Sequence, residues 1–167
     1  NMVTMDLKET GNIILVIGKT EGHLDQSLFS REILNEKNGP PPEINLFNEK
    51  NNGETILKLM DNKFIKAAHD VSLGGIITAL SKMCIKGKKG AVLKKPNYLI
   101  NQFEYLFGED QGRYIIEIDK NNLEDVVKIL LENSVHFDEL GSVNDDALII
   151  NDKSKVSIDD LIKSHTT

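Results

Sequence analysis

One segment near the middle of the chain, Phe64 to Ile85, restricts the possible folds more than any other. An apolar run of strand length, Phe64 to Ala68, leads into His69 and Asp70, and a helix-forming run then begins at Leu73. Its apolar residues recur with the period of one buried helix face: Ile76, Ile77, Leu80 and Cys84. A strand, a polar turn and a helix in this order predict unpaired backbone N–H groups facing outward at the turn.

The polar turn is the first candidate binding corner, formed by His69, Asp70, Ser72, Gly74 and Gly75. Ser72 is a natural helix N-cap, and the glycines allow a ligand to approach the backbone closely. Turns of this composition are also common as purely structural junctions, in which Asp70 caps the helix and His69 is a satisfied buried histidine. The residues alone leave both interpretations open.

The rest of the chain alternates between strand-like and helix-like runs. Periodicity predicts further strands over Ile13–Ile17, Gly90–Leu93, Tyr114–Ile118, Val135–Val143 and Ala147–Ile150. It predicts further helices over Leu28–Leu34, Leu46–Met60, Tyr98–Phe107 and Leu123–Leu131, the last capped by Asn121 or Asn122, and a final short helix opened by Ser157 to Asp160. The three prolines Pro40 to Pro42 predict an extended connection.

These elements predict an α+β fold, with helices packed on a mixed β-sheet. The order strand, helix, strand, strand from Tyr114 to Ile150 is typical of part of a ferredoxin-like unit. The turn Asn144 to Asp146 predicts that the last two of these strands form a hairpin. With 167 residues, we expect a single domain over 1–167.

Composition excludes several functional classes. A net charge of −6 argues against nonspecific nucleic-acid binding, which needs a basic face. No apolar run reaches the roughly 18 residues that span a bilayer, and we see no signal-peptide pattern. A single cysteine, Cys84, allows no disulfide framework, so we expect a cytoplasmic protein. Scattered histidines and the lack of nucleotide-loop or nucleophile motifs predict no metal ligand and no catalytic residue here.

A second polar cluster, Glu109, Asp110, Gln111 and Arg113, precedes the strand at Tyr114. Carboxylate or amide groups there could hydrogen-bond a ligand, and Arg113 could pair with Glu109 or bind an anion in bidentate fashion. The alternative is a loop in which Arg113 only neutralises the acids. We expect this cluster and the His69–Asp70 corner to share one cleft.

Four segments taken together resemble one enzyme family: Ile17 to Leu24, Gly39 to Pro42, Ala68 to Gly75 and Leu106 to Tyr114. The chain is similar over nearly its whole length to the last domain of the synthetase subunit in the phosphoribosylformylglycinamidine synthase family. That family belongs to the aminoimidazole ribonucleotide synthetase superfamily. Relatives such as selenophosphate synthetases or thiamine-phosphate kinases fit the Gly39 to Pro42 and Leu106 to Tyr114 segments less well.

The resemblance implies part of an ATP-dependent, magnesium-dependent ligase of purine biosynthesis. The full enzyme converts formylglycinamide ribonucleotide to formylglycinamidine ribonucleotide with ATP and glutamine-derived ammonia. Its implied partners are the other domains of the same chain, a glutaminase subunit and a small accessory subunit. The ATP-binding-type domains lie outside this chain, so the chain alone is expected to bind no cofactor tightly and to be inactive.

The resemblance also implies a role for Glu109, Asp110 and Gln111, because the matching segment of the enzyme's first half contacts the ribonucleotide. Two positions depart from the family pattern: Asp25 stands where glycine is usual, and Leu73 where aspartate is usual. Both changes disfavour anion binding, since a carboxylate repels phosphate. A noncatalytic scaffold domain with a vestigial nucleotide pocket therefore remains the alternative hypothesis.

Overall fold

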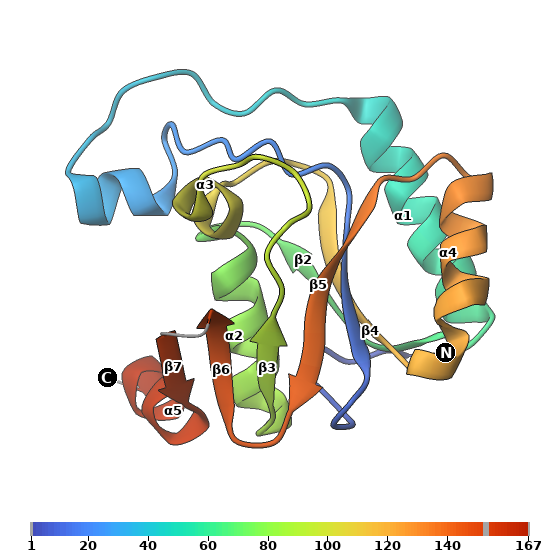
Figure 1. Ribbon diagram of the computed structural model, residues 1–167. Helices are drawn as coiled ribbons and strands as arrows, with labels where there is room; N and C mark the ends of the chain where they lie inside the picture. Colours follow the sequence, from blue (N-terminus) through green and yellow to red (C-terminus); the bar gives the residue numbers. More distant parts are fainter. Residues whose placement is uncertain (1, 152–153, 167) are drawn as a thin grey trace.

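A mixed sheet in the order β2-β4-β1-β5-β3-β6-β7 forms the middle layer of the molecule (Figure 1). The computed structural model describes residues 2–151 and 154–166. Within them the strands are β1 (Ile13–Ile17), β2 (Ile65–Val71), β3 (Gly90–Leu93), β4 (Arg113–Ile118), β5 (Phe137–Asn144), β6 (Ala147–Asn151) and β7 (Ser154–Ser157). The predicted α+β class with a mixed sheet is confirmed.

Helices cover both faces of the sheet. One face carries α1 (Leu46–Asp61) and α4 (Leu123–Glu132), and the other carries α2 (Gly75–Gly87), α3 (Gln102–Phe107) and α5 (Ile158–Thr166). A π-helical turn, η1 (Ser30–Leu34), and a 3₁₀ turn, η2 (Lys120–Asn122), complete the helical segments. The long connection through Pro40 to Pro42 contains neither helix nor strand, as its prolines predict.

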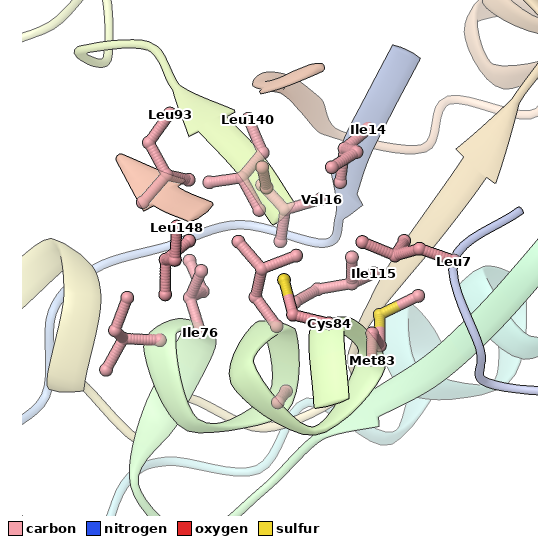
Figure 2. Packing of buried hydrophobic residues seen from close by; sticks show 14 of the residues in the cluster. Leu7, Ile14, Val16, Ile76, Met83, Cys84, Leu93, Ile115, Leu140 and Leu148 are labelled. Atoms are coloured by element: carbon pink, nitrogen blue, oxygen red, sulfur yellow. The ribbon is translucent and has the colours of Figure 1, made fainter. Parts of the chain in front are cut away.

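The core divides into two clusters because alternate residues of a strand point to opposite faces. Ile14 and Val16 of β1 pack with Leu80 of α2 in the first cluster, part of which Figure 2 shows. Leu15 and Ile17 pack in the second cluster, on the side of α1 and α4. These four of the five β1 side chains are fully buried, which explains why the strand is a continuous apolar run instead of an alternating one.

Half of the sheet has ferredoxin-like topology. The strands β2, β4, β1 and β5 are neighbours and each pair is antiparallel, with α1 connecting β1 to β2 and α4 connecting β4 to β5. The segment α2-β3-α3 is inserted between β2 and β4. The predicted ferredoxin-like unit is therefore present, but its last strand is β5, and β6 lies outside it.

The predicted hairpin between the last two long strands is wrong. Strand β3 lies between β5 and β6, antiparallel to the first and parallel to the second: Ala91 pairs with Val143 and with Leu148. The turn Asn144 to Asp146 predicted that β5 pairs with β6. Strand β3, which comes much earlier in the chain, lies between them instead. Gly90 allows this insertion, because a Cβ there would lie 2.0 Å from the Ala147 carbonyl oxygen.

The candidate corner also differs from the prediction. Strand β2 continues through His69 and Asp70 to Val71, because Asp70 and Val71 pair with β4. The turn is therefore shorter, and α2 begins at Gly75 with Gly74 as its N-cap in a left-handed conformation, φ 82°. Ser72 does not cap the helix, and its carbonyl oxygen instead accepts from the Gly75 N–H.

Three other boundaries were mistaken. The helix predicted over Tyr98–Phe107 starts only at Gln102, where Asn101 forms a capping box with Glu104. The side chains of Asn121 and Asn122 do not cap α4; η2 precedes it, and the Asp119 side chain accepts from the Asn121 N–H. Strand β7 was not predicted, although Ser157 does accept from the Asp160 N–H at the start of α5 as expected.

A buried carboxylate on β4 holds the segment before β1. Glu117 is completely buried, and its oxygens accept from the backbone N–H groups of Lys8 (2.8 Å) and Glu9 (3.0 Å) and from Asn12 Nδ2 (2.7 Å). These hydrogen bonds place Leu7 against α2, where its N–H reaches the Met83 carbonyl oxygen. Glu117 thus joins the N-terminal segment to both the sheet and a helix.

We expect Glu117→Ala to lower the free energy of unfolding by about 3 kcal/mol, because three buried donors lose their acceptor. Urea unfolding followed by circular dichroism measures this loss. Glu132→Gln, at an exposed residue of α4, is the matched control and should stay within about 0.5 kcal/mol of the parent. Equal stability of both variants would contradict the role of Glu117.

Candidate functional site

The acidic-amide loop before β4 joins three segments that are distant in the sequence. The Glu109 carboxylate oxygen Oε1 accepts from the Leu28 N–H at 2.7 Å and from the Gly74 N–H at 2.8 Å. The Glu109 N–H donates to the His23 carbonyl oxygen at 2.9 Å. Glu109 therefore connects the turn before α2 to the loop that follows β1.

Asp110 occupies a cradle of backbone donors. Its carboxylate accepts from the N–H groups of Glu21 (3.2 Å), Gly22 (3.0 Å) and His23 (3.1 Å), and the residue is buried. Successive N–H groups arranged in this way form an anion-binding nest. In this protein the chain's own carboxylate fills the nest, so Asp110 acts as an internal ligand.

Arg113 lies beneath this loop with its guanidinium fully buried. Nη1 donates to Thr20 Oγ1 at 3.1 Å, Nη2 to the Gly108 carbonyl oxygen at 2.6 Å, and Nε to the Asp110 carbonyl oxygen at 3.2 Å. Burial lowers the pKa of Arg113, while the Asp110 carboxylate 3.5 Å from Nη1 acts in the opposite direction. The sequence had suggested that Arg113 could pair with Glu109 or bind an external anion. The structure instead pairs Arg113 with Asp110 and buries its guanidinium beneath the loop.

A polar cavity of about 710 Å³ opens beside this loop. Gln111 and Asp110 reach it from the loop, and the first turns of α1 contribute Asn48, Glu49 and Asn52. Its remaining lining comes from the segment after β1, the proline connection and the turn before β5: Gly18, Lys19, Glu21, His23, Pro40, Pro41, Pro42, Glu43, Asn45, Ser134 and His136. Gln111 Nε2 donates to the Glu109 carbonyl oxygen at 3.3 Å, and the side chain is exposed at the cavity, where it can meet a ligand.

The His69–Asp70 corner lines a different, mostly apolar hollow of about 510 Å³ between β2 and α1. His69 Nδ1 lies 3.0 Å from the Asp70 carboxylate, and its side chain is 10% exposed. Neither Ser72, Gly74 nor Gly75 belongs to the lining of either hollow. Gly75 instead packs against the loop before β4, where a Cβ would lie 2.7 Å from the Gly108 and Leu106 carbonyl oxygens.

The two predicted clusters therefore touch but share no cleft. Glu109 brings them together through its hydrogen bond to the Gly74 N–H, whereas the two hollows have no lining residue in common. The expectation of one common cleft was wrong because β2 extends three residues further than predicted, to Val71. That extension directs His69 and Asp70 toward α1 and not toward the acidic-amide loop.

Sequence reasoning missed a polar cluster next to Arg113. The Tyr98 hydroxyl donates to Asp138 Oδ2 at 3.2 Å, and the ring of Tyr105 meets that of Tyr98 edge to face. Burial, together with the negative Asp138 nearby, raises the pKa of Tyr98 to about 12 and also raises the pKa of Tyr105. Tyr98 lies in the loop before α3, Tyr105 in α3 and Asp138 in β5, and no local motif links these segments, so the sequence carried no signal for this cluster.

The cavity does not suit the phosphates of ATP. Its lining holds the carboxylates of Glu21, Glu43, Glu49 and Asp110, and Lys19 is its only lysine or arginine among the residues described. The negative charges of these carboxylates repel the negative charges of a polyphosphate.

Over residues 2–151 and 154–166, no group of three or more His, Cys, Asp or Glu side chains is arranged to hold a metal ion. No helix in these ranges is both long and apolar enough to cross a bilayer.

Comparison with known proteins identifies relatives of this fold and sequence. Residues 9–152 match the family described as AIR synthase related protein, C-terminal domain. The chain is 86% identical over 166 residues to phosphoribosylformylglycinamidine synthase subunit PurL of Pelagibacter ubique, covering 99% of this chain and 23% of that protein. It is 40% identical over 164 residues to the PurL subunit of Bartonella bacilliformis, covering 98% of this chain and 22% of the relative. The chain thus spans less than a quarter of these relatives.

The fold resembles that of a Thermotoga maritima protein. The structure described as T. maritima PurL complexed with FGAR has a TM-score of 0.79 and 20% sequence identity, covering 96% of this chain and 29% of that one. Other structures of the same protein are described as a complex with ATP and as PurLQS, with TM-scores of 0.72 and 0.69. At this identity, the likeness establishes the fold.

We expect Asp110→Ala to lower the free energy of unfolding by about 3 kcal/mol or more, because three N–H donors lose their acceptor and Arg113 loses its nearest carboxylate. Denaturant titration measures the change. Gln111→Ala, one residue along the same loop, is the control and should stay within about 0.5 kcal/mol of the parent. Similar losses in the two variants would argue against the nest.

The tyrosine cluster predicts a stability loss at alkaline pH. The pKa of Tyr98 is about 12 in the fold against an ordinary value of 10, so the folded state retains the proton more strongly. Its contribution is complete below the ordinary value and is lost as pH rises toward the folded value. Denaturation across this range should show a shallower decline for Tyr98→Phe than for the parent. Equal slopes would rule out Tyr98 as a source of the decline.

Proposed function

The chain belongs to the family of AIR synthase related C-terminal domains, and from this membership we propose that it is one domain of phosphoribosylformylglycinamidine synthase subunit PurL. The single observation that carries this proposal is the 86% identity to the P. ubique subunit over 166 residues. The 166 aligned residues span the cavity, the acidic-amide loop and both core clusters. The activity of the whole enzyme requires the parts of PurL that this chain does not contain.

The proposed reaction is ATP-dependent ligation in purine biosynthesis, in the cytoplasm. ATP supplies activation of the formylglycinamide oxygen as a phosphate ester, and ammonia from glutamine then displaces the phosphate. The carboxylate-lined cavity of this domain is a poor site for ATP, so we assign nucleotide and Mg²⁺ binding to other domains of the subunit. In this proposal the chain contributes no catalytic residue, and it supports a reacting site that lies in other domains of the subunit.

We assign different roles to the nine candidate residues. Gln111, whose side chain is exposed at the polar cavity, is the residue best placed to contact the uncharged part of the ribonucleotide, because the carboxylates of the lining disfavour its phosphate. Glu109, Asp110 and Arg113 position the loop that carries it, and Gly74 and Gly75 allow that loop to pack on α2. His69, Asp70 and Ser72 lie away from the polar cavity and are assigned no ligand contact there.

The proposed partners are the remaining domains of the same chain, a glutaminase subunit and a small accessory subunit. The T. maritima structure described as PurLQS supports an assembly of this kind.

A noncatalytic scaffold domain is the second candidate function. One observation favours it: the polar atoms of Glu109, Asp110 and Arg113 are engaged in internal hydrogen bonds, as a structural loop requires. Calorimetry with ADP, ATP and formylglycinamide ribonucleotide separates the two candidates. Binding of the ribonucleotide that Gln111→Ala abolishes would exclude the scaffold-only role.

A chimeric subunit tests the proposed function. In the PurL subunit of P. ubique, the matching segment is replaced by this chain, and formylglycinamidine ribonucleotide formation is measured with ATP and ammonium. We expect a turnover number within a factor of about three of the parent, because the two segments are 86% identical over 166 residues. The isolated chain serves as the control and should give no turnover.

Two outcomes would contradict the proposal. One is a chimera that is folded, as judged by its thermal transition, but gives less than about one hundredth of the parent turnover. The other is turnover by the isolated chain, which would place the chemistry within this domain.

A further inference from the structure

Asn38 and Gly39 form an exposed pair in the connection between η1 and α1. In the part of the chain that the structure describes, neither the Asn38 side chain nor the Gly39 N–H takes part in a hydrogen bond. Gly39 has no Cβ to shield its backbone nitrogen, and its φ of +89° is a conformation that glycine adopts without strain. Among the described residues, no hydrogen bond therefore holds the Gly39 nitrogen away from the Asn38 carboxamide.

A second Asn–Gly pair in the same chain lies in the opposite environment. Asn52 is buried in α1, and its Nδ2 donates to the Gly112 carbonyl oxygen at 2.9 Å. Gly53 is inside the same helix, where backbone N–H groups are hydrogen-bonded along the helix axis. The helix holds this nitrogen away from the preceding side chain. The molecule thus contains its own internal control.

We propose that Asn38 is a site of spontaneous deamidation and isoaspartate formation. The Gly39 backbone nitrogen attacks Asn38 Cγ, a new C–N bond closes a five-membered succinimide, and the side-chain amide leaves as ammonia. The nitrogen's proton leaves with it. Water then adds to one of the two imide carbonyls and breaks one C–N bond. Opening on one side gives aspartate, and opening on the other gives isoaspartate, in which the main chain runs through the former side chain.

The structure predicts a local consequence of the isoaspartate product. Gln26 Nε2 donates to the Lys37 carbonyl oxygen at 3.0 Å and to the Gly39 carbonyl oxygen at 3.1 Å, so one amide group bridges Asn38. Isoaspartate adds a methylene group to the main chain between these two acceptors. The Gln26 amide cannot keep both hydrogen bonds across the longer span. The added carboxylate also lies near that of Asp25, which packs against Gly39.

The change reaches the polar cavity through the adjoining prolines. His23 Nε2 lies 2.9 Å from the Pro40 carbonyl oxygen, and Pro40, Pro41 and Pro42 form one wall of the cavity. Loss of the Gln26 bridge frees the start of this wall. Asn38 is thus a modification site whose product alters the cavity wall without touching the acidic-amide loop.

Peptide mapping by mass spectrometry tests the proposal on the 167-residue chain aged at neutral pH. The peptide that contains Asn38 should gain about 1 Da and become a substrate for protein isoaspartyl methyltransferase. In the folded protein, it should convert at least about tenfold faster than the Asn52 peptide, and in urea the two rates should converge. An Asn38 that stays intact in the folded chain, or an Asn52 that reacts equally fast there, would overturn the proposal.

Two variants separate the chemistry from its consequence. Asn38→Gln should slow conversion at this position by roughly tenfold or more, because a six-membered ring forms less readily, and should leave Asn52 unaffected. Asn38→Asp carries the added charge but keeps the normal main chain, so its Gln26 side-chain amide signals in NMR spectra should stay near those of the parent. The aged isoaspartate form should shift them. Unshifted signals in that form would refute the predicted loss of the Gln26 bridge.

Discussion

The buried guanidinium of Arg113 is the group on which one end of the sheet depends. It lies at the start of β4 and donates to Thr20, Gly108 and the Asp110 carbonyl oxygen, which belong to two different loops. A buried cation without these acceptors would be strongly destabilising. The loop after β1 and the loop before β4 must therefore stay together whenever the protein is folded, and the part of the polar cavity that these two loops line keeps its shape.

This constraint explains why a motif with several charged side chains can have a structural role. Asp110 fills a nest that would otherwise attract an external anion, and Glu109 holds the turn before α2. The loop leaves the Gln111 amide exposed at the cavity. Such an arrangement is consistent with the proposed role, in which this chain presents one polar wall to a reaction site that other parts of the enzyme complete.

Much of the fold could be predicted because it depends on local patterns. The uninterrupted apolar run at β1, the helical period of α2 and the prolines of the connection each correspond to the structure. The errors arose where a contact between distant segments outweighed the local signal. Pairing with β4 extended β2 through Asp70, and insertion of β3 separated two strands that their turn residues had suggested were a hairpin.

The sequence by itself determined the α+β class, most of the helices and strands, and the four segments that together make the family resemblance specific. Only the tertiary structure decided which polar groups are hydrogen-bonded inside the protein and which remain exposed. The physical reason is that a carboxylate or guanidinium looks the same in a sequence whether its partners are backbone groups or a ligand. The backbone donors that hold Asp110 lie 87 to 89 residues away, and Thr20, one acceptor of Arg113, lies 93 residues away, beyond the reach of any local pattern.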